Sequence, residues 1–359
     1  MKSDTLQIRE ISTRTFWLTV VLLLCFSGMA EGITRMEQFQ APLTPPKMGS
    51  RHYQLGHKLA LLDAAREQGP LDCIVVGSSM VDVGFDPEAF QSGYRNQTGQ
   101  DIHCFNFGID SSIAVSTAVI AKILINDYQP RILIVGTDPR DYGVPQDERG
   151  PAVIFNSPWI RYRQGYFSPE GWLLDHSYLY RYRQHLSRLI RLNSSDTLWS
   201  NTKLNFPILP NGYTMVTKVS TVINDPPDPE DTSYEVVYYN GIFSSYQIYD
   251  ENIAAMDEIL GYQDFGTQVI VVEMPVSDGL YYFFGAGESD YNRFIAHVEE
   301  LTELHHVPFW RTEPLDMIPD DGWSDYSHLN VTGAGIFSTW LGEQVGQAEQ
   351  LENSGISQP

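Results

Sequence analysis

A serine that follows an apolar run is the first residue here whose type and setting could support chemistry. The stretch CIVVGSSM is apolar at residues 73–76 and turns polar at Gly77, Ser78 and Ser79. Glycine and serine are also common where a strand simply ends, so the turn alone is equally typical of a structural strand end. A serine hydroxyl becomes a nucleophile when a base removes its proton and a third group orients that base. The rest of the chain must therefore supply both groups.

Asp325 and His328 are the residues that could provide the base and its partner. They lie three residues apart in SDYSHLNVTGAG, at the start of a segment with helical character. Histidine titrates near neutral pH, and a partner on its second ring nitrogen fixes its tautomer and orientation. A carboxylate three residues away on a tight turn can be that partner. The alternative is a surface aspartate and histidine near a helix cap.

Two further strand ends could supply the donors that stabilise an oxyanion. Gly108 ends the apolar run in FNFGID, and its backbone N–H could act together with that of Ser79. The run LIVGTDPRD ends similarly, at Gly136, Thr137 and Asp138. Open α/β sheets build their sites at the carboxyl ends of parallel strands, so these turns are expected at one edge.

The elements that would position these residues alternate along the chain between strand-like and helix-like segments. Continuous apolar strands separated by helices are typical of a parallel sheet covered on both faces. The sequence therefore predicts an α/β core in two parts, residues 70–149 and 251–345. The expected strands are residues 73–76, 102–109, 131–138 and 267–275, and the expected helices are residues 53–69, 114–125, 251–260 and 290–304.

Residues 150–250 lack this alternation and are too long for a simple loop, which predicts an inserted or cap subdomain. The section contains an amphipathic stretch at residues 171–192, a hairpin-like stretch at 206–216 and an acidic, proline-rich stretch at 224–235. Arginines among tyrosines are typical of a solvated helix face, but they could also bind an anionic or sugar-bearing polymer, with Arg161 and Arg163 nearest the site. These arginines are Arg161, Arg163, Arg181, Arg183, Arg188 and Arg191.

The N-terminal residues 1–35 are expected to be a signal peptide or a membrane anchor, with a buried core helix as the less favoured alternative. Basic residues precede an uncharged run at residues 16–30, which has the length of a signal h-region and favours an N-terminus inside the cell. Cleavage after Ala30 would release the protein, whereas extension of the run through Ile33 would leave an anchor. Either version exports the remainder, which begins with a linker and leading helix at residues 36–69. A polar tail is expected at residues 346–359.

Composition narrows the class of protein. Hydrophobic residues make up 42% of the chain and aromatic residues 12%, which indicates a globular fold. A net charge of −22 makes nucleic acid a poor partner. Cys73 and Cys104 are expected to be two buried thiols by default, with a disulfide as the alternative in an oxidising compartment. The cysteine and histidine spacings suggest no metal, and no glycine-rich cofactor motif follows the first strand.

Taken in order, these motifs resemble the SGNH (GDSL-like) hydrolase family. The residues Gly77 to Met80 stand where the family has Gly-Asp-Ser-Leu, which makes Ser79 the matching nucleophile. Gly108 matches the oxyanion glycine block, and Asp325 and His328 match the Asp-x-x-His block. The resemblance covers residues 70–145 and 252–345 and implies a flavodoxin-like, three-layer α/β/α fold with a large insertion. VVGSSMVDVGFDP, FNFGID and DYSHLN further resemble the membrane-anchored bacterial branch that includes proteins of alginate O-acetylation and teichoic-acid D-alanylation.

The resemblance implies a serine-dependent esterase or O-acyltransferase that acts through an acyl-enzyme on acyl groups of cell-envelope polysaccharide. The implied partners are an acylated glycan, or another ester substrate, and a membrane-embedded acyltransferase; no cofactor is implied. A secreted esterase of small esters is a further interpretation.

One position departs from the family pattern. The family's Gly-x-Asn-Asp block donates an amide N–H to the oxyanion, whereas this chain has Asp138, whose ionised carboxylate can only accept. Asp138 could be protonated, Thr137, Asn106 or Arg140 could replace the donor, or backbone groups alone could form the hole. The departure favours the alternative of a non-catalytic SGNH-like domain that binds envelope polymer or serves as the scaffold of an acylation complex.

Overall fold

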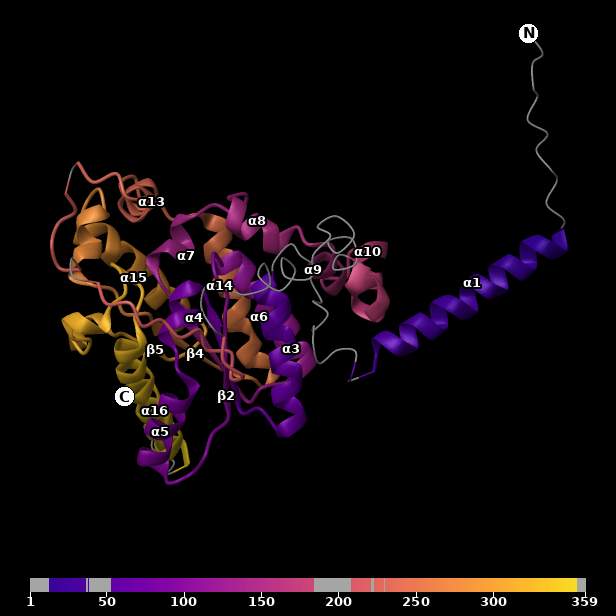
Figure 1. Cartoon of the computed structure of the whole chain (residues 1–359). Helices are drawn as coiled ribbons and strands as arrows, with labels where there is room; N and C mark the ends of the chain where they lie inside the picture. Colours follow the sequence, from indigo (N-terminus) through magenta and orange to yellow (C-terminus); the bar gives the residue numbers. More distant parts are fainter. Residues whose placement is uncertain are drawn as a thin grey trace, which may run out of the picture.

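The computed structural model describes residues 13–36, 38, 53–183, 208–220, 223–228 and 230–353 of the 359-residue chain. Its centre is a five-stranded, fully parallel sheet in the order β2-β1-β3-β4-β5 (Figure 1). This is the flavodoxin-like strand order, which places a topological switch point between β1 and β3. The strands are β1 (Cys73–Gly77), β2 (Cys104–Gly108), β3 (Ile132–Thr137), β4 (Gln268–Glu273) and β5 (Phe309–Trp310).

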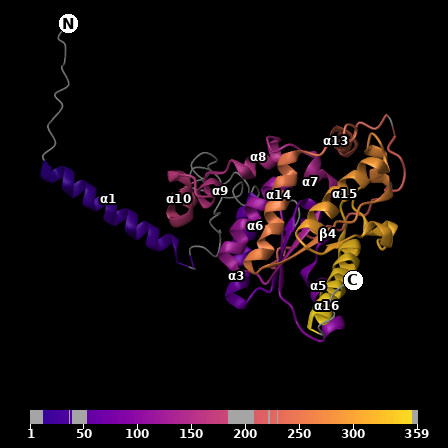
Figure 2. The same ribbon diagram turned by 180° about the vertical axis from the view of Figure 1, so that it is seen from behind.

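Helices cover both faces of the sheet. Val76 and Val135 point to one face and Val75 and Ile134 to the other, because side chains alternate along a strand. Burial on both sides explains why the strands are continuous apolar runs. The predicted three-layer α/β/α fold is therefore confirmed. The first face is covered by α3 (Tyr53–Gln68), α6 (Ala114–Tyr128), α14 (Asp250–Leu260) and α15 (Glu288–Leu304), and the second by α5 (Pro87–Thr98) and α16 (Val331–Asn353), which lie side by side in Figures 1 and 2.

A short helix, α4 (Ser79–Gly84), packs against β1 and β2 at their carboxyl ends. Two glycines allow this close approach. A Cβ on Gly77, whose φ is +156°, would lie 2.5 Å from the carbonyl oxygen of Gly136, and a Cβ on Gly108 would overlap the backbone of Asp82. Glycine therefore sets the position of α4, and with it the position of Ser79 as its first residue.

The last helix, α16, differs from the expectation at both of its ends. Asp325 and His328 do not lie on a helix: they lie on a turn closed by a hydrogen bond of 2.8 Å from Ser324 N to the His328 carbonyl. Asn330 caps α16, which starts only after it. The expected polar tail is helical as far as Asn353, and Ala348 within it is buried where α16 packs on α5.

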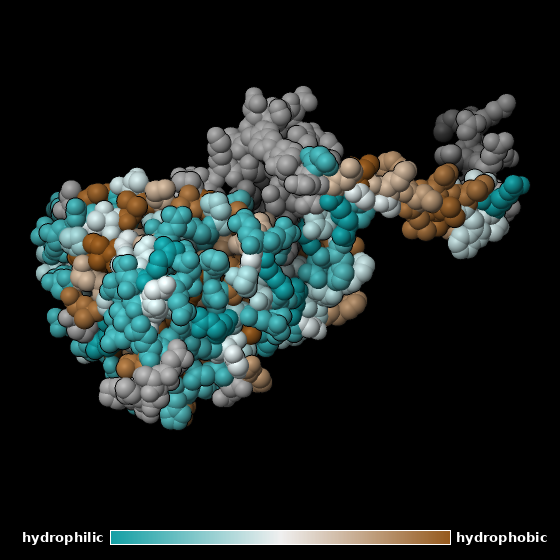
Figure 3. All heavy atoms as spheres, turned by 90° about the horizontal axis from the view of Figure 1, so that it is seen from below, coloured by the Kyte–Doolittle hydropathy of each residue, from teal (hydrophilic) through white to brown (hydrophobic). Residues whose placement is uncertain are grey.

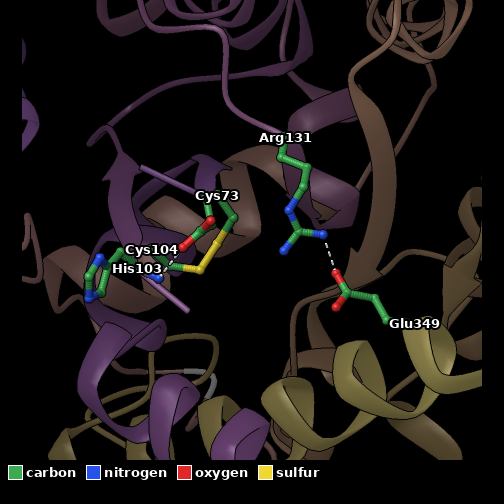
Figure 4. Close-up of a disulfide and its surroundings, with 6 residues drawn as sticks. Cys73, His103, Cys104, Arg131 and Glu349 are labelled. Carbon is green, nitrogen blue, oxygen red and sulfur yellow. Dashed lines mark hydrogen bonds and ion pairs between the residues drawn. A yellow bond between two sulfur atoms is a disulfide. The ribbon is translucent and has the colours of Figure 1, made fainter. Parts of the chain in front are cut away.

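The two cysteines of the core form a disulfide, which corrects the default expectation of two thiols. Cys73 and Cys104 are paired in the register of β1 and β2, with their Cα atoms 4.5 Å apart. Figure 4 shows the disulfide at the amino ends of the strands, with the ion pair between Arg131 and Glu349 beside it. The disulfide and ion pair lie at the opposite end of the strands from Ser79.

Residues 139–250 supply short helices around the sheet. These are α7 (Pro139–Gly143), α8 (Arg149–Phe155), α9 (Pro158–Arg163), α10 (Pro169–His176) and α13 (Tyr234–Phe243). An isolated antiparallel bridge between Ile208 and Thr214 lies in the expected hairpin-like stretch. Arg188 and Arg191, and most of the expected linker, lie outside the described residues.

The N-terminal run forms a single helix, α1 (Thr13–Thr34), which projects from the domain in Figures 1 and 2. Its 22 residues are long and apolar enough to cross a membrane, a property that a signal sequence near the N-terminus shares. Figure 3 shows its hydrophobic side chains standing clear of the largely hydrophilic domain surface.

Candidate active site

Ser79, His328 and Asp325 converge at the carboxyl edge of the sheet, although 249 residues separate the first two. The Oγ of Ser79 lies 2.8 Å from Nε2 of His328. On the other side of the ring, Nδ1 of His328 lies 2.8 Å from Oδ2 and 2.9 Å from Oδ1 of Asp325. The structure thus joins the three predicted residues in a hydroxyl–imidazole–carboxylate chain, which is the geometry of an activated nucleophile.

The pKa values of Asp325 and His328 suit proton transfer from Ser79 to His328. Burial alone would raise the pKa of Asp325, but the charge of His328 and hydrogen bonds from its ring and from backbone N–H groups lower the pKa to about 2. Burial alone would lower the pKa of His328, yet Asp325 outweighs it, with smaller contributions from Asp138 and Asp110, so the pKa of His328 is raised. Asp325 is therefore ionised at neutral pH and stabilises the imidazolium that forms when His328 accepts a proton.

A tyrosine that the sequence did not single out holds the carboxylate in place. The hydroxyl of Tyr239 on α13 lies 3.1 Å from Oδ1 of Asp325 and 2.6 Å from Oγ of Ser327. Burial, reinforced by the negative charge of Asp325, raises the pKa of Tyr239 well above its usual value, so the hydroxyl stays protonated. In the sequence, YEVVYYNGIF offers only an aromatic-rich helical segment as a signal.

One of the two expected backbone donors is engaged elsewhere. Ser79 is the first residue of α4, so its N–H has no carbonyl partner within that helix and remains suited to an oxyanion. The N–H of Gly108, by contrast, donates to Oδ1 of Asn106 at 2.9 Å. The N–H of Gly108 is thus used to hold the Asn106 side chain, and its oxyanion role stays a prediction.

Asn106 and Thr137 do not replace the missing amide donor. Nδ2 of Asn106 donates to the carbonyls of Val81 and Phe85, at 2.8 and 2.6 Å, which holds α4 on the strand ends. The Thr137 side chain is fully buried beside the hydroxyl of Tyr142, and neither Asn106 nor Thr137 lines the pocket at Ser79.

Asp138 accepts hydrogen bonds and caps a helix, so it is not an oxyanion donor. Its Oδ2 accepts from Oγ of Ser78 at 2.8 Å, and its Oδ1 accepts from the backbone N–H of Arg140 at 2.7 Å. These bonds make Asp138 the N-cap of α7. The suggested donor role of Asp138 is therefore wrong, since both of its oxygens are occupied as acceptors.

Arg140 is the cation that faces the pocket. Its Nε donates to the hydroxyl of Tyr238 at 2.6 Å, and its Nη1 donates to the carbonyl of Ser112 at 2.9 Å. Burial alone would lower the pKa of Arg140, but Tyr238 and the nearby carboxylates of Asp138 and Asp141 raise it. Arg140 is thus fixed, charged and next to the same pocket as Ser79.

Arg161 and Arg163 do not line the pocket at Ser79, and a contact of either with substrate stays a prediction. Arg163 forms ion pairs with Asp127, near the end of α6, and with Asp175. Because α6 begins at the site edge and has 15 residues, its far end is about 20 Å away. Arg161 is exposed and stacks over Tyr166, at 5.7 Å from the ring centroid.

Ser79, His328 and Arg140 line a small pocket with mainly apolar walls. The pocket is narrow, with about 20 Å³ open to the centre of a water molecule, and part of it opens to solvent. Its size beside Ser79 suits a small acyl group. The walls include Met80, Pro139, Tyr238, Tyr239, Phe243 and Leu280.

A buried ion pair that was not predicted from the sequence joins α3 to α4. Nζ of Lys58 on α3 is fully buried, 2.5 Å from Oδ1 of Asp82 and 2.7 Å from the carbonyl of Gly108. Gln54 and Thr214 donate to the two oxygens of the same carboxylate, each at 2.7 Å. Burial lowers the pKa of Lys58, although Asp82 opposes this shift. The pair ties α3 to the helix that begins at Ser79.

Among the described residues, no group of three or more histidine, cysteine, aspartate or glutamate side chains is placed to hold a metal ion.

No protein-family model matches the chain, and no curated protein sequence matches it.

Two solved structures are similar to this chain in part. One is a lipase/acylhydrolase from Enterococcus faecalis, with a TM-score of 0.37 and 8% identity over 77% of this chain and 97% of that one. The other is a carbohydrate acetylesterase family member from Sinorhizobium meliloti, with a TM-score of 0.34 and 10% identity over 77% of this chain and 98% of that one. At these values we draw no conclusion about activity from the similarity, and the chemistry rests on the geometry of the site.

Proposed function

We propose that the protein is a serine-dependent esterase or O-acyltransferase that acts on small acyl groups of a cell-envelope polysaccharide through an acyl-enzyme. The observation that carries this proposal is the continuous chain of hydrogen bonds from Ser79 through His328 to Asp325. Its chemistry is that of a nucleophile, a general base and an orienting carboxylate.

In the proposed first half-reaction, Oγ of Ser79 attacks the ester carbonyl while Nε2 of His328 takes the hydroxyl proton. The tetrahedral intermediate collapses as the bond to the alcohol breaks, and His328 returns the proton to the departing oxygen. Water or a sugar hydroxyl then attacks the acyl-enzyme while His328 takes its proton; the bond between the acyl carbon and Oγ of Ser79 breaks, and His328 returns the proton to that oxygen. Asp325 stays ionised throughout and holds the imidazole in the required tautomer.

The proposed oxyanion site combines the N–H of Ser79 with the guanidinium of Arg140. Arg140 supports this role because it lines the pocket at Ser79 and is held by Tyr238 and Ser112. A fixed cation near the carbonyl oxygen would stabilise developing negative charge where the family pattern uses an asparagine amide.

The pocket volume supports a small acyl group. The apolar helix α1 and the disulfide between Cys73 and Cys104 support a location outside the cytoplasm, since disulfides persist in oxidising compartments. The envelope polysaccharide and a membrane-embedded acyl donor as partner follow from the sequence resemblance alone. Assays with an added glycan acceptor test these two parts of the proposal.

Labelling with a short-chain fluorophosphonate tests the nucleophile. Folded protein should be labelled, Ser79→Ala should not, and the neighbouring Ser78→Ala should remain labelled. Labelling that persists in Ser79→Ala would assign the chemistry to another residue. Release of free acid that falls when an acylatable glycan is added would identify a transferase, whereas equal release with and without glycan would identify a hydrolase of small esters.

A non-catalytic binding or scaffold domain is the second candidate. It is favoured by the lack of an asparagine amide at Asp138 and by the engaged N–H of Gly108. For this candidate, folded wild-type protein should resist the fluorophosphonate while still binding envelope polymer.

A further inference from the structure

The end of α1 is bound to the domain next to α10. The carboxylate of Glu31 accepts from Oγ of Ser177 at 2.7 Å and from the backbone N–H groups of Tyr178 and Leu179 at 2.9 and 3.1 Å. Arg35 donates to the carbonyl of His176 at 2.7 Å, and its guanidinium lies 4.8 Å from the ring centroid of Tyr178. These bonds fix the position of α10 relative to the end of the apolar helix.

Next to this junction lies a set of exposed aromatic side chains, which we name the aromatic face: Tyr166, Phe167 and Trp172. Their exposed fractions are 59%, 95% and 50%, although burial of such side chains normally stabilises a folded protein. Trp172 stacks on His176, with ring centroids 5.0 Å apart, so the aromatic face is continuous with the residues that hold Arg35.

Arginine side chains lie among the aromatic rings of this region. Arg163 and Arg183 are paired with carboxylates and Arg181 is buried, whereas Arg161 is exposed. Arg161 lies over the ring of Tyr166, and Arg183 lies 3.8 Å from the ring centroid of Tyr180. Tryptophan and tyrosine with arginine are the residues that favour the interface between bilayer and water, where the rings contact lipid and the cations contact headgroups.

The length of α1 places this region at the membrane surface. A helix of 22 residues is about 33 Å long, close to the roughly 30 Å hydrocarbon core of a bilayer. If α1 spans the bilayer, Glu31 and Arg35 lie at its outer boundary, and the segment that they bind must lie there too. In Figures 1 and 2, α10 lies on the side of the domain nearest α1, and α13 lies on the opposite side.

We propose that α1 is retained as an anchor and that the aromatic face rests in the lipid headgroup layer beside the point where α1 leaves the membrane. The occupant of this surface is the bilayer itself. The domain is then held in one orientation by two contacts, the spanning helix and the aromatic face. This inference does not depend on the acyl chemistry, and its test measures depth in the membrane.

The test uses the full-length chain in vesicles of phosphatidylcholine and phosphatidylglycerol, in a Cys25→Ser background that removes the free cysteine. An environment-sensitive fluorophore is attached at Phe167→Cys or, as a matched control, at Tyr234→Cys. Tyr234 is an aromatic residue that is 83% exposed and lies on α13. Insertion of α1 is verified in each preparation by resistance to alkaline extraction.

The fluorophore at position 167 should emit at shorter wavelength in vesicles than in detergent-free buffer and should be quenched by lipids with a nitroxide in the headgroup region. The fluorophore at position 234 should be quenched only by a water-soluble quencher. Equal, water-like behaviour at both positions while α1 is inserted would overturn the proposal. A mature N-terminus at Glu31, found by mass spectrometry of protein from cell envelopes, would also overturn it.

Discussion

The substitution Asp325→Asn isolates the contribution of one charge to the relay, because it keeps the shape of the side chain and removes its ionisation. The lowering of the Asp325 pKa from 3.8 to about 2 corresponds to about 2 kcal/mol of stabilisation of the ionised form. The substitution should therefore lower the free energy of unfolding at pH 7 by about 2 kcal/mol.

The dependence of this loss on pH follows from the sign of the shift. The pKa of Asp325 is lower in the folded state, so its stabilisation is fully present above pH 3.8 and is lost as the pH falls towards 2. The difference in unfolding free energy between the wild type and Asp325→Asn should accordingly shrink on acidification. Chemical denaturation at a series of pH values measures this, with Asp321→Asn, at an exposed position on the same loop, as the control.

The catalytic consequence of Asp325→Asn is larger. Without a carboxylate on Nδ1, His328 loses its fixed tautomer, and kcat/KM for a short-chain aryl ester should fall by about 10³–10⁴. The pKa of His328 is raised chiefly by Asp325, so the wild-type rate should rise with pH through an inflection above 6.5. The inflection should move to lower pH in Asp325→Asn. A loss of less than tenfold, or an inflection that does not move, would refute the proposed relay.

Three further predictions concern the surroundings of the relay. Arg140→Gln should lower kcat by about 10²–10³ with little change in KM if the guanidinium faces the oxyanion, as steady-state kinetics would reveal; an unchanged kcat would exclude that role. Lys58→Met should lower the free energy of unfolding by about 3–5 kcal/mol, because it leaves the buried carboxylate of Asp82 unpaired, and the double variant with Asp82→Leu should recover part of this loss in thermal denaturation. Replacing Cys73 and Cys104 by alanine should cost about 3–4 kcal/mol in denaturant unfolding, given their separation of 31 residues; a loss below 1 kcal/mol would contradict the cross-link.

The strands and the residues of the relay could be predicted from the sequence for a local physical reason. A strand buried on both faces is apolar throughout, and its end is marked by residues such as Gly77 and Gly108. Parallel strands bring those ends to one edge, so Ser79 could be placed at the site by its position after the first strand. Asp325 and His328 lie within one turn of each other, and their pairing is therefore also local.

The remainder of the site depends on contacts that are distant in sequence. Tyr239 reaches Asp325 across 86 residues, and Lys58 reaches the carbonyl of Gly108 across 50. No spacing rule connects such pairs, because a lysine within an amphipathic helix is normally solvated and an aromatic residue on a helix normally packs in the core. The Gly108 contact is local instead: its N–H lies where an oxyanion donor is expected, but it donates to Oδ1 of Asn106, two residues earlier, and the sequence pattern did not indicate that bond.

The hydrogen bonds of Asn106 include both a contact that is local in sequence and contacts that are distant in sequence. Its amide nitrogen donates to the carbonyls of Val81 and Phe85 on or next to α4, and its Oδ1 accepts from Gly108 and from Lys58. A single buried side chain thereby links the helix that begins at Ser79, the end of β2 and α3, through Lys58. An asparagine that satisfies so many buried groups fixes the position of the nucleophile through the backbone of α4, without contact with the substrate. The cost of using the Gly108 N–H in this way is the loss of one oxyanion donor, which is why the charge of Arg140 at the pocket carries so much of the proposed catalysis.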